Sequence, residues 1–114
     1  IRHFNMGRIL TEISEGELLD KISILEIKLK EIKDENLLKE VRKEHKILNE
    51  LKNNSINFSE EIKSLYISLK ETNMKIWLIE NEKRLCEKNS EFNDKFIKLS
   101  RDEYLGNDQR ARIK

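Results

Sequence analysis

The stretch GELLDKISILEIKLKEI, residues Gly16 to Ile32, has more apolar residues than one narrow helical stripe can hold. Ile24 and Ile27 lie on the opposite side of that helix from the main stripe. A helix that is apolar on two sides is buried on two sides, so this stretch predicts a helix with at least two neighbours. The main stripe follows the 4-3-4-3 spacing of a helix that packs along another helix: Leu18, Ile22, Leu25, Leu29 and Ile32.

The start of this helix carries the strongest local signal in the chain. Ser14 and Glu17 form an S-x-x-E capping box, in which each side chain accepts from the other residue's amide. Ser59 is expected to cap the third helix in a similar way. Interruptions of the apolar pattern separate four helices, at 33–36, 53–58 and 89–93, and Gly106 is expected to end the last and shortest of them.

The overall composition favours long helices that are washed by solvent. The 114 residues are 39% charged, 37% hydrophobic and only 6% aromatic, and they include no proline. We therefore predict an all-α protein, an antiparallel helical bundle or long helical hairpin of about four helices, completed by self-association. Residues 9–114 are expected to form one helical domain, and residues 1–8 a flexible N-terminus or expression remnant, with Met6 as a candidate natural start.

The third helix repeats the two-sided pattern of the first. Leu69 and Ile76 belong to one apolar stripe, which also holds Trp77. A second stripe is too extensive for the few other apolar residues of the chain to cover, which predicts a homo-oligomer, with a dimer as the first expectation. The predicted intersubunit residues are Ile67, Met74, Leu78 and Leu85.

Charge and cysteine content narrow the classes of partner. The net charge is +1 with acidic and basic residues interspersed, so we expect no nucleic-acid partner, and Arg110 to Lys114 is interpreted as a solvated helix end. No apolar run is long enough for membrane insertion to be expected. Cys86 is the single cysteine, which suggests a reducing, cytoplasmic location. No catalytic motif and no metal or cofactor signature is found, so the sequence leans away from an enzyme.

Polar residues on the inner faces of the first and third helices allow a second interpretation. If the two helices pack together, a small ligand site could lie between them. Alternatively, Asn73 fixes the helix register while Glu80 and Arg84 form an exposed pair, and this simpler interpretation is favoured. Trp77 is similarly interpreted as core rather than as a stacking platform. The candidate ligand-binding residues are Asp20, Lys21, Asn73, Glu80, Arg84 and Arg101.

The chain resembles a family of short uncharacterised bacterial proteins classed only as a domain of unknown function. Three segments carry the resemblance: GELLDKISILEIKLKEIKD (16–34), the W-x-I-E segment within IWLIENEKR (76–84), and FNDKFIKLSRDEYLGNDQRARIK (92–114). This chain has Asn81 where the family pattern tends to be acidic, which weakens any carboxylate-cluster site. The resemblance implies a helical protein with no established activity and a faint link to surface-polysaccharide pathways.

Two functional hypotheses follow. The leading one is a non-enzymatic, self-associating helical protein that acts as an accessory or scaffold for another bacterial protein. The alternative is a small helical enzyme or ligand-binding protein with a polar site between the first and third helices. A concave pocket with unpaired donors around Glu80 and Arg84 would favour the alternative, and a flat surface there would favour the first.

Overall fold

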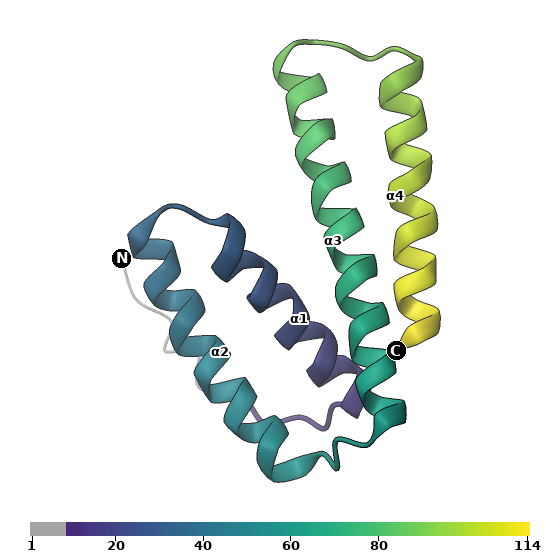
Figure 1. Ribbon diagram of the computed structural model, residues 1–114. Coiled ribbons are helices and arrows are strands. Elements are labelled where there is room, and N and C mark those ends of the chain that lie inside the picture. The colour runs from purple at the N-terminus through teal and green to yellow at the C-terminus, as the bar shows by residue number, and fades with distance from the viewer. Residues whose placement is uncertain (1–8) are drawn as a thin grey trace.

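The computed structural model describes residues 9–114 and consists, over that range, of four helices and no strand (Figure 1). The prediction of an all-α protein is therefore confirmed. The helices are α1 (Glu15–Glu31), α2 (Glu35–Ser55), α3 (Glu60–Lys88) and α4 (Asp94–Ile113).

Side-chain caps define where each helix begins. The Ser14 hydroxyl accepts a hydrogen bond from the Glu17 amide at 3.1 Å, and the Ser59 hydroxyl accepts one from the Ile62 amide at 3.3 Å. Both of these hydrogen bonds were predicted from the sequence. The return bond of the predicted box, from the Ser14 amide to the Glu17 side chain, is not among the hydrogen bonds of residues 9–114, and Glu17 pairs with Lys114 instead. Asp34 and Asn93 cap α2 and α4 in the same manner, so every helix start has a side chain that satisfies a free amide.

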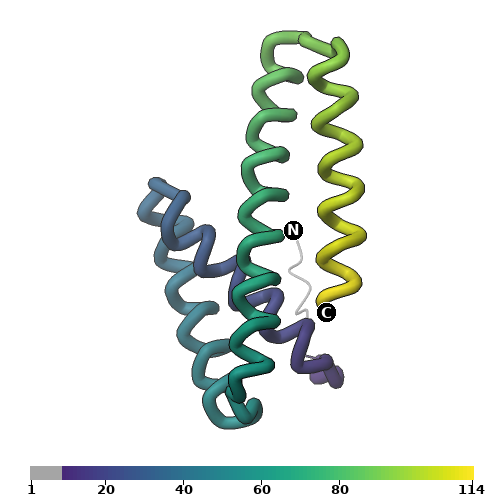
Figure 2. The backbone as a smooth tube through the Cα atoms, turned by 45° about the vertical axis from the view of Figure 1, so that its right-hand side comes forward, coloured from purple at the N-terminus to yellow at the C-terminus, as the bar shows by residue number. Residues whose placement is uncertain are grey.

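The helices form two antiparallel hairpins that cross each other. One hairpin is α1–α2 and the other is α3–α4, and the two meet where α1 packs against α3 (Figure 1). The far half of the α3–α4 hairpin extends beyond the α1–α2 hairpin, as both Figure 1 and Figure 2 show. In that half, α3 and α4 have only each other as helical neighbours.

The core lies at the crossing of the two hairpins. Leu19, Ile22 and Leu69 are almost completely buried there. Leu18 and Ile56 complete the central cluster, and no residue of α4 is fully buried. Most buried residues come from α1 and α3, as expected, and burying each large aliphatic side chain is worth about 1.5–3 kcal/mol.

Two predicted helix ends differ from the structure. α2 continues through Asn53 and Asn54 to Ser55, so the loop is shorter than expected. α4 does not end at Gly106 but continues to Ile113. Gly106 is a packing residue instead, because a Cβ atom at this position would lie 3.1 Å from Ile76 Cγ1 on α3. The absent side chain lets α3 and α4 approach closely.

The left-handed conformation that was predicted at Gly106 is found at Ser90 instead, where it ends α3. Ser90 has a φ of 55° and is the one non-glycine residue with positive φ among the described residues. Its amide donates to the Glu87 carbonyl at 3.1 Å, and the Glu91 amide donates to the Cys86 carbonyl at 2.7 Å. This pair of hydrogen bonds is a Schellman motif, which ends α3 and turns the chain toward α4.

Candidate functional site

A buried polar network lies where α1 meets α3. The Asn73 side-chain amide donates to Asp20 Oδ1 at 2.8 Å and to Ser23 Oγ at 2.7 Å. Ser23 Oγ in turn donates to the Asp20 carbonyl oxygen at 2.7 Å. All three residues are buried, at 0–5% exposure. Buried polar groups cost free energy unless they are hydrogen-bonded, and these side chains satisfy one another.

The end of α4 joins this network. Arg110 Nη1 donates to Asn73 Oδ1 at 3.4 Å. Lys114 Nζ lies 3.5 Å from Asp20 Oδ2 and 3.0 Å from Glu17 Oε1, so it bridges two carboxylates of α1. The interpretation of this basic end as solvated was therefore wrong for Arg110 and Lys114, whereas Arg112 is exposed. Sequence reasoning ended the helix at Gly106 and so missed that the last turns of α4 carry these cations back to α1.

A cavity of about 280 Å³ opens beside the network, between α1, α3 and α4. Asn73 forms part of its wall, and Glu80 and Arg84 line it from the next turns of α3. Trp77 is half-buried in the same wall, so it is neither fully in the core nor free on the surface. The remaining lining residues are Ile24, Ile27, Lys28, Ile76 and Arg110.

The six candidate ligand-binding residues fall into three places. Asn73, Glu80 and Arg84 share the cavity, and Asp20 lies behind Asn73. Lys21 is exposed on α1. Arg101 is exposed on α4 and lines a separate hollow, which also holds Asp94 and Ile97. Lys28 and Arg110 were absent from the candidate set and are added by the fold.

The cavity has an excess of positive charge. Lys28, Arg84 and Arg110 come from three different helices, and Glu80 is the one carboxylate among the lining residues. Over residues 9–114, the ion pairs do not include one between Glu80 and Arg84, although the two residues are four apart on α3. Glu80 and Arg84 thus line a concave surface rather than a flat one, and Arg84 is exposed at its edge.

A second polar cluster surrounds Glu26 on α1. Its carboxylate accepts from the Tyr66 hydroxyl and from Lys70 Nζ, the latter at 3.2 Å, and His45 Nε2 lies 3.5 Å away. Burial acts to raise the Glu26 pKa, but the hydrogen bonds from Tyr66 and Lys70, the charge of Lys70 and the neighbouring His45 together outweigh it, and the net pKa is lowered. Burial and the hydrogen bond to Glu26 raise the pKa of Tyr66. The cluster ties α1 to α2 and α3, and its His45 Nε2 is a buried side-chain atom without a hydrogen-bond partner among the described residues.

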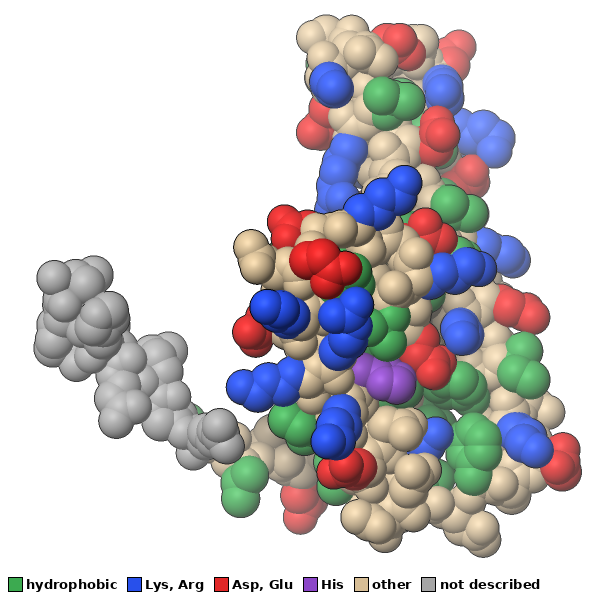
Figure 3. Space-filling model, turned by 60° about the vertical axis from the view of Figure 1, so that its left-hand side comes forward, with side chains coloured by type: hydrophobic (Ala, Val, Ile, Leu, Met, Phe, Trp, Pro, Cys, Tyr) green, Lys and Arg blue, Asp and Glu red, His purple; other side chains and the backbone are tan. Residues whose placement is uncertain are grey.

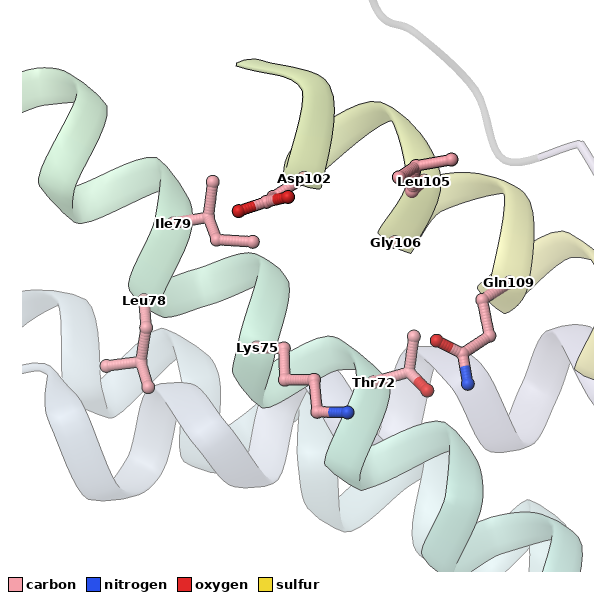
Figure 4. Close-up of a pocket in the computed structure, with 8 residues that line it drawn as sticks. All are labelled: Thr72, Lys75, Leu78, Ile79, Asp102, Leu105, Gly106 and Gln109. Atoms are coloured by element: carbon pink, nitrogen blue, oxygen red, sulfur yellow. The ribbon is translucent and has the colours of Figure 1, made fainter. Parts of the chain in front are cut away.

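The predicted intersubunit stripe lies on the side of α3 that faces away from the core. Ile67 and Leu78 are both 55% exposed and Leu85 is 50% exposed, while Met74 is half-buried. A hollow borders the stripe on each side, one toward α1 and one toward α4. Figure 4 shows the latter: Ile79 and Asp102 point toward each other from α3 and α4, whereas Leu78 points away from α4.

The remaining surface and the single cysteine suggest no further reactive centre. Figure 3 shows basic and acidic side chains interspersed over one face of the molecule, without a continuous field of either sign. Cys86 is 2% exposed. Among the described residues there is no group of three potential metal ligands, and no helix is long and apolar enough to cross a membrane.

Comparison with known proteins identifies the family of this chain. Residues 9–114 match a family described as "Family of unknown function (DUF6165)". The match covers nearly the whole chain, so the protein belongs to this family. Comparisons with curated proteins and with solved structures gave no match.

Proposed function

We propose that this family member is a self-associating helical protein, and that the outer side of α3 binds a second copy of the chain. The observation that carries the proposal is the exposed apolar stripe of α3. Ile67, Leu78 and Leu85 remain at least half exposed in the single chain. A row of large apolar side chains along one helix is more costly to leave in water than scattered ones, and it fits a partner helix.

The spacing along this side of α3 supports a helical partner. The stripe is part of a continuous 4-3 repeat, the pattern by which two helices pack along a seam. Its seven positions are Ile67, Glu71, Met74, Leu78, Asn81, Leu85 and Lys88. Met74 is half-buried and the other six are exposed. We call these seven residues the α3 seam.

The polar members of the α3 seam favour a second copy in antiparallel orientation. If a two-fold axis passes between Ile79 and Glu80, Glu71 of each copy lies opposite Lys88 of the other. The same axis places Met74 opposite Leu85 and sets Asn81 beside Leu78. The charged pairs at the two ends and the two Met74–Leu85 pairs then match, as an isologous interface requires, whereas Ile67 lies opposite position 92, beyond the seam. A parallel arrangement would instead bring two copies of Glu71 together.

The extension of the α3–α4 hairpin supports the same partner. Its far half has no cover from α1 or α2 (Figure 2), and two helices alone bury little apolar surface. A second copy would convert this half into a four-helix arrangement. We further propose an accessory or scaffold role for the assembly, and the family resemblance alone suggests surface-polysaccharide pathways.

Sedimentation of a matched pair of variants tests the proposal. Leu78→Glu would place a charge in the interface, so the dimer should dissociate while the helical content of the subunit is retained. Ile47→Glu on α2 is the control, because Ile47 is 57% exposed and Leu78 is 55% exposed. The control should leave association unchanged.

Leu69→Ala tests the core side of α3, whereas Leu78→Glu tests its outer side. Leu69 is 1% exposed, so its truncation should lower the free energy of unfolding by about 2–5 kcal/mol. A wild-type chain that stays monomeric at high micromolar concentration would refute self-association. Equal loss of helicity in Leu78→Glu and Leu69→Ala, with no folded monomer, would show that the two sides of α3 are wrongly assigned.

A further inference from the structure

We propose that the cavity between α1, α3 and α4 binds a small organic anion that carries a flat ring. This inference goes beyond self-association and rests on different residues, because the α3 seam contributes none of the lining of this cavity. It commits to one ligand chemistry: a carboxylate or phosphate group joined to an aromatic or similar planar ring.

The cations of the cavity account for the anionic part of the ligand. Lys28, Arg84 and Arg110 approach from α1, α3 and α4, and they outnumber the single lining carboxylate, Glu80. Like charges gathered around one hollow repel each other, and an anion between them relieves that repulsion. Guanidinium groups also match carboxylate and phosphate oxygens in a bidentate geometry.

Arg110 is positioned to present donors to such an anion. One guanidinium nitrogen donates to Asn73 Oδ1 at 3.4 Å, which orients the group at the edge of the cavity. Asn73 itself is fixed by Asp20 and Ser23 at 2.8 and 2.7 Å. The other Arg110 donors have no protein partner among the hydrogen bonds of residues 9–114. A guanidinium held from behind by a rigid network loses little conformational freedom when a ligand binds.

The ring is inferred from the apolar part of the wall. Trp77 is half-buried and lines the cavity together with Ile24, Ile27 and Ile76. An indole ring offers a flat apolar face against which a planar group can stack. The volume of about 280 Å³ is slightly smaller than that of pockets for drug-sized ligands, so it suits a single ring with one acidic group. Glu80 can accept a hydrogen bond from a hydroxyl or amino substituent.

Trp77 provides a direct readout because it is the only tryptophan of the chain. We would titrate the full chain with phenyl phosphate, which has both ring and anion, and follow tryptophan fluorescence together with the melting temperature. Inorganic phosphate and phenol are the probes that carry only one of the two features. Phenyl phosphate is expected to bind at least about tenfold more tightly than either, because each part adds its own contacts.

Two arginine variants test the cationic part. Arg84→Gln should weaken phenyl phosphate binding by about tenfold, the effect of losing one charge-assisted contact. Arg101→Gln is the matched control, because Arg101 is also an exposed arginine but lies outside this cavity. Arg101→Gln should bind phenyl phosphate as tightly as the wild type does. Leu78→Glu should do so too, because this substitution lies in the α3 seam and outside the cavity.

Three results would overturn the proposal. The first is no response of either readout to phenyl phosphate at millimolar concentration. The second is equal affinity for phenyl phosphate and inorganic phosphate, which would show that the ring adds nothing to binding. The third is equal weakening in Arg84→Gln and Arg101→Gln, which would show attraction by net charge rather than by this cavity.

Discussion

Asn73 on α3 donates a hydrogen bond to Asp20 on α1 across 2.8 Å, and both side chains are buried. Lys114, the residue that follows α4, lies 3.5 Å from Asp20 Oδ2, so one carboxylate holds partners from α3 and from the end of α4. A shift of α1 against α3 by one turn would leave these buried polar groups without partners, which adds a desolvation cost to the lost apolar packing. The pair therefore selects one register for the crossing of the hairpins.

Asn73→Ala should lower the free energy of unfolding by about 2–4 kcal/mol, because Asp20 and Ser23 would each lose a buried donor. Urea denaturation monitored by circular dichroism measures the change. Asn54→Ala, at an exposed position of α2, is the control and should change stability by no more than about 0.5 kcal/mol.

A double-mutant cycle shows whether the cost arises from this contact. In an Asp20→Asn background the buried charge is gone, so Asn73→Ala should be less damaging there. Because the amide oxygen introduced by Asp20→Asn can still accept from Asn73, an identical cost in both backgrounds would mean that the charge of Asp20 adds nothing measurable to this contact.

Charge exchange along the α3 seam should reveal the orientation of the proposed dimer. Glu71→Lys alone should weaken association, because two lysines would then face each other at each end of the interface. Adding Lys88→Glu should restore it. Each contact is worth about 0.2–1 kcal/mol, and the two-fold axis doubles the effect. Sedimentation at low and high salt measures both changes, and Glu44→Lys on the exposed side of α2 is the control.

The opposite pattern would contradict the antiparallel arrangement. In a parallel dimer Glu71 faces its own copy, so Glu71→Lys alone would change association little. The double variant would then show no restoration relative to the single one.

Acidification should weaken the contact between α1 and α3 through Glu26. The pKa of Glu26 is lowered in the folded chain from its ordinary value of 4.5. A lowered carboxyl pKa adds stability that is complete above pH 4.5 and is lost as the pH falls through the folded-state value. Unfolding free energies measured at several pH values below neutrality should therefore fall more steeply for the wild type than for Glu26→Gln. Glu40→Gln, on exposed α2, should keep the wild-type slope.

Local signals in the sequence predicted much of the fold. The caps at Ser14 and Ser59 depend only on residues within one turn, and both serine hydroxyls accept the expected amide. The apolar periodicity likewise identified Leu69 as core, at 1% exposure. Gly106 was misinterpreted because a glycine near a helix end has two physical uses, a left-handed cap or a close helix contact. Only the position of Ile76 on α3 distinguishes them.

The candidate cavity was only partly predictable, for a related reason. Asn73, Glu80 and Arg84 share one side of α3, so helical spacing alone groups them. Arg110 joins them only because α4 continues past Gly106 and returns to α1. Lys21 and Arg101 were predicted to line the site but do not. Both belong to helices that border the cavity, yet both are exposed and neither is among its lining residues.

The turn between α3 and α4 offers a stabilising substitution. Ser90 adopts a φ of 55°, a conformation that disfavours residues with a Cβ atom. Its two flanking hydrogen bonds belong to the backbone, from Ser90 to Glu87 and from Glu91 to Cys86, so a glycine can keep both. Ser90→Gly should therefore raise the free energy of unfolding by about 0.5–1 kcal/mol, measured by urea denaturation.

Ser64→Gly is the matched control, because Ser64 is exposed within α3 and has ordinary helical geometry. There the same change should destabilise by about 0.5–1 kcal/mol, since glycine loses more backbone entropy in a helix. The opposite signs of the two changes distinguish relief of the left-handed conformation from any general effect of removing a serine side chain. Destabilisation by both would show that the Ser90 side chain contributes more to this turn than its backbone conformation costs.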